Sequence, residues 1–286
     1  MMRLFVTLLA LSLGLVQAAP DVSPFRKPAQ NESSDMNSTA TLESLLESAN
    51  WDAVDHAQRE GPAALPTIRQ YARSKNYRTR QISVACAARI GGNEAAAIVA
   101  GGLIDDNVNV QLQAAKELSS GKFPSAAQAV LEQLSHGQEY LVREFLALAA
   151  GYIPGSQAVA ILRPLAEGKG TLATNARMAL CRLGDERALS ELIKDLSSSS
   201  PRTRYESLDQ LRYVANPKLI PYAKRLLSDK EPAVRIGLAR HPRFRRVCDQ
   251  AVDTLVFLLQ LHPPFRVAAE QIYTDEELRQ VRDLMQ

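Results

Sequence analysis

The sequence predicts an all-α fold, a right-handed α-solenoid of helical hairpins, and three observations lead to this prediction. One local pattern recurs seven times at intervals of 30 to 32 residues. Each copy reads as an apolar residue or Thr, then Arg or another polar residue, then a small-residue helix that often ends at Gly. A Leu-rich amphipathic segment follows. A fixed period of this length is typical of a solenoid, in which each repeat buries its apolar face against its neighbours. The second position of the pattern falls at Arg80, Gln111, Arg143, Ala173, Arg204, Arg235 and Arg266.

Two segments, 79–91 and 172–184, show the first helix of the repeat most clearly. Both are rich in small residues, and they close on Gly91 and Gly184. The small residues predict that neighbouring helices approach closely, and glycine suits the left-handed backbone that often ends a helix. In the segment 186–196 apolar residues recur at helical spacing, which predicts the second helix of the hairpin.

These features resemble the HEAT-repeat proteins, in particular the short HEAT-like repeats of the phycobilisome-lyase type. The resemblance rests on the Val-Arg start of several copies, the Ala-rich first helix, the Leu183-Gly184 stop and the Leu-rich second helix. It covers about residues 62–286. It implies the fold more than the function, because repeats of this kind serve enzymes, adaptors and inhibitors alike.

The resemblance also implies a ladder of ion pairs between repeats, made by an Asp six residues before the repeat Arg. Here Asp105 precedes Gln111 and Asp229 precedes Arg235, and only the second pair is complete. The ladder is therefore expected to be eroded, which leaves the repeat arginines to face solvent or a ligand.

The N-terminus predicts export. Residues 1–18 combine a short basic start, an apolar stretch and a small-residue cleavage site after Ala18, as in a bacterial secretory signal peptide. An uncleaved membrane anchor is the alternative. Residues 19–41 are rich in Pro, Ser and Asn and predict a flexible linker. Residues 42–286 then form the predicted solenoid of about seven repeats with an acidic helical cap, in a protein that is periplasmic or secreted.

Charge is distributed unevenly along the chain. Residues 31–60 carry seven acidic side chains and one Arg, whereas residues 201–250 carry twelve Lys and Arg against five Asp and Glu. The densest basic run predicts a binding site for an anionic group, because arginine contacts carboxylates and phosphates with two donors. A solvated surface that keeps the protein soluble is the alternative. The candidate residues are Arg235, Arg240, His241, Arg243, Arg245 and Arg246. If they do not bind, the second-helix face around Arg163, Lys194 and Lys224 is the next candidate.

The three cysteines are expected to differ. Cys86 and Cys181 occupy small-residue positions of first helices about three repeats apart, so we expect two buried thiols that are too distant for a disulfide. Cys248 follows the basic run, which predicts an accessible thiol with a favoured thiolate.

Catalytic signals are weak. The four histidines lie in unrelated repeats, and the sequence lacks the HExxH, GxSxG, CxxC and Walker patterns. Aromatic residues make up 6% of the chain, which suits tight helix packing better than a large cofactor cavity. The sequence therefore predicts a protein that is not an enzyme and holds no metal and no cofactor.

The sequence as a whole predicts an exported, non-catalytic binding protein, either a scaffold or an inhibitor of the immunity type. We expect it to hold a partner protein with an acidic surface on the concave second-helix face, with help from the basic run. We expect a monomer without nucleic-acid binding or stable membrane insertion. The alternative is a chromophore-lyase type of enzyme acting on an anionic small molecule in the solenoid groove.

Overall fold

The computed structural model describes residues 40–136, 139–237, 242–268 and 270–286. The predicted signal peptide and all but the last two residues of the predicted linker lie outside these ranges. Within the described ranges, no helix is both long and apolar enough to cross a membrane. The chain divides into two compact units, residues 1–126 and 127–286.

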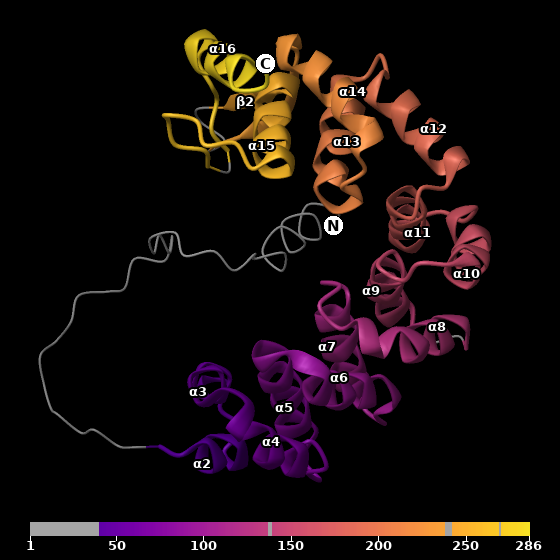
Figure 1. The fold of residues 1–286 in the computed structure, drawn as a ribbon, viewed down its shortest axis with the longest axis vertical. Coiled ribbons are helices and arrows are strands. Elements are labelled where there is room, and N and C mark those ends of the chain that lie inside the picture. Colours follow the sequence, from indigo (N-terminus) through magenta and orange to yellow (C-terminus); the bar gives the residue numbers. More distant parts are fainter. Residues whose placement is uncertain (1–39, 137–138, 238–241, 269) are drawn as a thin grey trace, which may run out of the picture. The chain divides into compact units, whose positions relative to one another are not determined.

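The first unit is helical throughout its described part (Figure 1). Side chains cap several of its helices: Thr41, Asn76 and Asn107 each accept a hydrogen bond from a main-chain N–H in the first turn. The helices are α2 (Leu42–Glu47), α3 (Asp52–Glu60), α4 (Leu65–Tyr71), α5 (Tyr77–Ile90), α6 (Gly92–Gly101) and α7 (Val108–Leu118).

The second unit adds further helices and a small two-stranded sheet (Figure 1). Its helices are α8 (Ala127–Ser135), α9 (Tyr140–Ala150), α10 (Ser156–Ala166), α11 (Thr171–Arg182), α12 (Glu186–Leu196), α13 (Pro201–Val214), α14 (Ile220–Arg225), α15 (Val247–Leu259) and α16 (Asp275–Asp283). The strands are β1 (Pro232–Ile236) and β2 (Arg243–Arg246).

In both units the odd-numbered helices stack in sequence order. In the first unit α3 packs on α5 and α5 on α7; in the second, α9 packs on α11, α11 on α13 and α13 on α15. Small residues make this possible. Ala87, Ala114 and Ala147 are fully buried in the stacks. A side chain at Gly151 would collide with the Tyr213 hydroxyl and with Ala179. The even-numbered helices form the second member of each hairpin. This architecture confirms the predicted all-α solenoid of HEAT-like hairpins.

Two repeat arginines join consecutive repeats through a carboxylate. The guanidinium of Arg80 donates to both oxygens of Asp105 at 2.8 and 2.7 Å, and that of Arg204 donates to Asp229 at 2.7 Å. Each arginine also donates to the carbonyl six residues before it, and Gln111 does the same. The expectation that the repeat arginines face solvent or a ligand is therefore wrong for these two. The pairing runs from each arginine to the Asp 25 residues later, in the next repeat.

The repeat register differs from the sequence alignment in one copy. Arg80, Arg143 and Arg204 each lie three residues after the first residue of their helix. Because α11 begins at Thr171, the equivalent residue there is Thr174, not Ala173. The one-residue offset was not visible in the sequence, because neither Ala173 nor Thr174 marks the position as the arginines of the other copies do.

The last two copies of the pattern are not helices. The copy at Arg235 forms β1, because Val234 and Ile236 alternate with polar residues, and Gly237 ends the strand with a positive φ of 78°. The copy at Arg266 lies in an irregular segment between α15 and α16. It follows two consecutive prolines at 263 and 264, which remove the main-chain donors that a helix needs.

Candidate functional site

The basic run forms an antiparallel hairpin, β1–β2, that interrupts the helical repeat. Arg235 of β1 lies opposite Phe244 of β2. Directly opposite residues project on the same face of a sheet, so the two side chains are neighbours. Phe244 is 48% exposed, and Arg235 and Arg243 are exposed as well. The outer face of the hairpin, which carries Phe244 and Arg235, therefore presents an aromatic ring beside an arginine.

The other face of the hairpin is anchored in the molecule by Arg245, which is only 4% exposed. Its guanidinium donates to Asp253 at 2.8 Å and to the hydroxyl of Tyr205 at 3.2 Å. The hydroxyl of Tyr273 donates to the second oxygen of Asp253 at 2.6 Å. Burial raises the pKa of Asp253, which Arg245 and Tyr273 partly offset. The result is a buried polar contact between β2 and α15.

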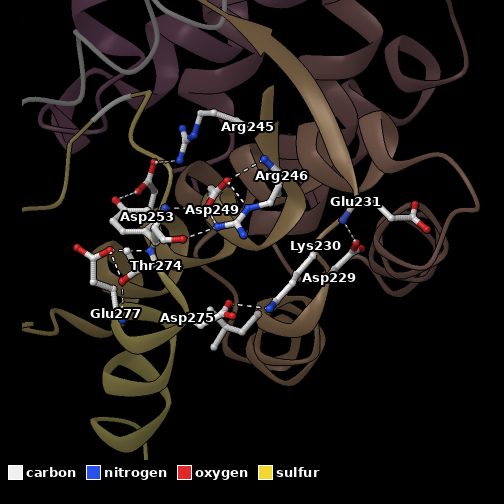
Figure 2. A network of polar contacts seen from close by, with 12 residues as sticks. Asp229, Lys230, Glu231, Arg245, Arg246, Asp249, Asp253, Thr274, Asp275 and Glu277 are labelled. Carbon is white, nitrogen blue, oxygen red and sulfur yellow. Dashed lines mark hydrogen bonds and ion pairs between the residues drawn. The ribbon is translucent and has the colours of Figure 1, made fainter. Parts of the chain in front are cut away.

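Arg246 forms a second anchor at the start of α15 (Figure 2). Its guanidinium donates to Asp249 at 2.7 and 3.1 Å, and its main-chain N–H donates to the same carboxylate at 2.8 Å. Asp249 also accepts the N–H of Tyr273 at 3.0 Å, and Arg246 reaches the Tyr273 carbonyl. The strand, the helix and the segment before α16 are thereby held together.

The structure divides the predicted site residues into three groups. Arg235 and Arg243 are exposed on the hairpin. Arg245 and Arg246 are turned toward internal carboxylates, so the prediction that they read an external anion is wrong for this pair. Arg240 and His241 lie outside the described residues. Asp249, Asp253 and Tyr273 were not among the predicted residues, although acidic residues four apart on the apolar α15 were a signal for an internal partner of the arginines.

The prediction for Cys248 is also wrong. The thiol is fully buried, and burial together with Asp249 raises its pKa to about 11. Arg246, which was expected to favour the thiolate, is occupied by Asp249. Cys86 and Cys181 are buried free thiols, as predicted.

Two open clefts lie on the second unit. The first, of about 710 Å³, is lined by the start of α10 and by Arg163 and Arg182. Arg182 stacks on the ring of Tyr152 at 3.8 Å, whereas Arg163 is largely exposed and pairs with Asp185 at 2.9 Å. The second cleft, of about 520 Å³, lies between α11, α12 and α13 and includes Lys194. No group of His, Cys, Asp and Glu in the described ranges could hold a metal ion.

The fold is similar to solved HEAT-like structures. A chain from the complex of CpcE and CpcF of phycocyanin lyase from Nostoc sp. PCC7120 matches with a TM-score of 0.55 and 17% identity, over 93% of this chain and 98% of that chain. The archaeal HEAT-like repeats protein from Thermococcus onnurineus NA1 matches with a TM-score of 0.40 and 14% identity, over 80% and 99% of the two chains. The chain has the HEAT-like repeat fold. No protein-family model and no curated protein matches the sequence.

The likeness to the lyase chain contradicts the prediction that the protein is not an enzyme. That prediction rested on the absence of familiar catalytic patterns, yet a fold of this kind is part of a lyase complex. The identity of 17% supports the shared fold, and the reaction belongs to the similar protein.

Proposed function

We propose that this chain is an exported protein-binding HEAT-like repeat protein that holds an acidic partner protein through the outer face of the β1–β2 hairpin. The observation that carries the proposal is Phe244. It is a large aromatic side chain, 48% exposed, on a strand whose next two residues, Arg245 and Arg246, are bound to carboxylates of α15. Aromatic and arginine side chains dominate the energetics of protein interfaces.

The anchoring of the hairpin supports this proposal. Arg245 and Arg246 attach β2 to α15, so the exposed side chains on the strand are presented from a supported backbone. A binding group that is already ordered loses less conformational entropy when a partner arrives. Arg235 lies opposite Phe244, and the exposed Arg243 precedes it in β2, so the hairpin carries a positive charge that favours a partner with acidic groups. The similar CpcE–CpcF structure is itself a complex of two proteins.

The proposed function is tested with three purified proteins: the wild type, Phe244→Ala and the double variant Arg243→Gln/Phe244→Ala. Each is used to capture partners from an envelope extract. We expect Phe244→Ala to weaken capture about tenfold or more, since an anchor of this kind contributes roughly 2 kcal/mol. The helical signal and the melting temperature should be unchanged. Equal capture by all three proteins would exclude the hairpin and direct attention to the second-helix residues Arg163, Lys194 and Lys224.

A second candidate, a chromophore-lyase type of enzyme, is favoured by the cleft at Arg163 and Arg182. Its volume of about 710 Å³ is in the range of small-molecule sites, and its two arginines suit an anionic ligand. Titration with biliverdin, an anionic linear tetrapyrrole, tests it through the absorbance of the chromophore. Saturable binding that Arg163→Gln weakens would support this candidate. Absence of a spectral change would reject it.

A further inference from the structure

One position of the repeat is occupied by an Asp in two of its copies. It is the third residue before a first helix or its equivalent strand, and it is occupied by Asp105 before α7 and by Asp229 before β1. Each carboxylate accepts from the arginine of the preceding repeat, Arg80 or Arg204. Each also accepts a main-chain N–H two residues later, at 2.9 and 3.1 Å. The surroundings of this place therefore form a receptor for one carboxylate.

The hairpin of α9 and α10 has the same arginine without the carboxylate. Arg143 lies at the position of Arg80 and Arg204, three residues into α9. The third residue before α11 is Gly168, which has no side chain to offer. The Nε of Arg143 is buried and has no hydrogen-bond partner among the residues that the structure describes. A buried donor without an acceptor is costly, and it is rare in native structures.

The start of α11 is capped differently from that of α7. Gly170, the N-cap of α11, makes no side-chain cap bond, and the hydroxyl of Tyr140 accepts the N–H of Leu172 at 3.5 Å, whereas Asn107 caps α7 through its own side chain. The residues from 167 to 170, which include this position, are exposed. Tyr140 and Leu141 at the start of α9 are 47% and 42% exposed and add an apolar rim.

The acidic groups nearby in the sequence do not replace the missing Asp. Glu144, the next residue along α9, is buried, and burial raises the pKa of its carboxyl, which favours the neutral form. Glu167 is 69% exposed and lies 3.9 Å from Arg187.

We propose that Arg143, for which Gly168 stands at the repeat position of the paired Asp, is a receptor for an Asp or Glu side chain of the partner protein. The choice of a protein side chain as occupant rests on the proposed function and on the apolar rim of Tyr140 and Leu141. The choice of a carboxylate as the bound group rests on Asp105 and Asp229 alone, which pair with the equivalent arginines Arg80 and Arg204. A carboxylate from outside would complete the contact that Arg80 and Arg204 make within the chain.

The receptor is tested first without any partner, by supplying the missing carboxylate. Gly168 has no positive φ, and a Cβ there would meet the Leu165 carbonyl oxygen at 3.3 Å, a tight contact that Gly168→Asp and Gly168→Asn share, so the comparison of the two variants cancels it. We expect Gly168→Asp to melt about 2–4 °C above Gly168→Asn. The difference should vanish in an Arg143→Gln background. An equal difference in both backgrounds, or none in either, would overturn the receptor.

The second test uses the unaltered protein and a small probe. The Nε–H signal of Arg143 is followed by NMR while blocked aspartate, acetyl-aspartate amide, is added, with acetyl-asparagine amide as the control. We expect a saturable shift with aspartate only, and at least tenfold weaker binding to Gly168→Asp. No shift, or the same shift in both proteins, would overturn the proposal. A shift that appears only in Glu167→Gln would also overturn it, because Glu167 would then fill the receptor itself.

The two proposals fail in different ways. Melting and blocked-aspartate binding do not depend on the hairpin or on a partner, so the receptor can be confirmed even if Phe244→Ala leaves capture unchanged. If the receptor is real and the partner uses it, Gly168→Asp should reduce capture at least fivefold while Gly168→Asn does not. Unchanged capture by Gly168→Asp would overturn the assignment of its occupant to the partner protein.

Discussion

Arg245 carries its positive charge inside the molecule, and its neighbours determine what a substitution does. It is 4% exposed and bound to Asp253, Tyr205 and Gln250. Removing one member of a buried ion pair leaves the other charge without compensation. The arginine therefore attaches the hairpin to α15 through Asp253.

We predict that Arg245→Gln lowers the free energy of unfolding by about 3 kcal/mol. Arg243→Gln, two residues away on the exposed part of the strand, should change it by less than about 0.5 kcal/mol. Urea unfolding followed by circular dichroism measures both. Equal stability of the two variants would show that Arg245 is solvated and that the buried pair with Asp253 is absent.

The buried thiol of Cys248 gives a second prediction at this scale. Because the side chain is fully buried and its pKa is raised to about 11, it should not react with a thiol reagent in the folded protein at pH 7. Reaction should begin at the urea concentration that unfolds the second unit. Fast labelling of the native protein at Cys248 would contradict the packing of α15.

Glu144 gives a prediction about pH. Burial raises the pKa of this carboxyl above its ordinary 4.5, and one of its oxygens has no partner among the described residues. A raised folded-state pKa means that its contribution to stability is present below pH 4.5 and is lost as pH rises through the folded value. The variant Glu144→Gln should therefore gain stability over the wild type as pH rises from 4 to 8, in urea unfolding. A constant difference over this range would contradict the shift.

The elements differ in how far the sequence determines them. The first helix at 171–182 and the second helix at 186–196 follow from small-residue content and apolar periodicity, and both were predictable. The strand at Val234 and Ile236 begins with the same Val-Arg pattern as a helix, so the repeat alignment concealed it. The alternation of period two over only a few residues was the available signal, and it was too short to outweigh the repeat.

Side-chain pairing across elements was harder to predict than the elements themselves. Which Asp pairs with which repeat Arg depends on how neighbouring hairpins are stacked, and Asp229 pairs with Arg204 of the previous repeat and not with Arg235 six residues later. The same holds for Arg245 and Arg246. A run of arginines read along the chain gives no indication that Arg245 and Arg246 each meet a carboxylate of α15 while Arg243 stays exposed.

At the element scale we predict that the arginine–carboxylate contacts between repeats are worth more than surface pairs. Arg204 is 11% exposed and its partner Asp229 is 14% exposed. Arg204→Gln should therefore destabilise the second unit by about 2 kcal/mol or more, whereas Arg187→Gln, in a pair exposed by 78% and 51%, should have little effect. Thermal melting of the two variants decides between these outcomes. Similar melting temperatures would mean that the contacts between repeats are solvated.

For the whole molecule, export remains a prediction from residues 1–18. Mass spectrometry of the purified protein should find a mature chain beginning at Ala19, recovered from the periplasm or the medium. Intact Met1 on protein recovered from the cytosol would contradict export and would remove the envelope as the source of the partner.

Photocrosslinking decides whether a partner protein contacts the outer face of the hairpin. A photoreactive phenylalanine analogue is placed at position 244, and in a matched protein at exposed Gln157 on α10. We expect one dominant crosslinked partner from position 244, with an acidic surface, and no equivalent product from position 157. A product from position 157 alone, or none from position 244 in the compartment where the protein accumulates, would contradict it.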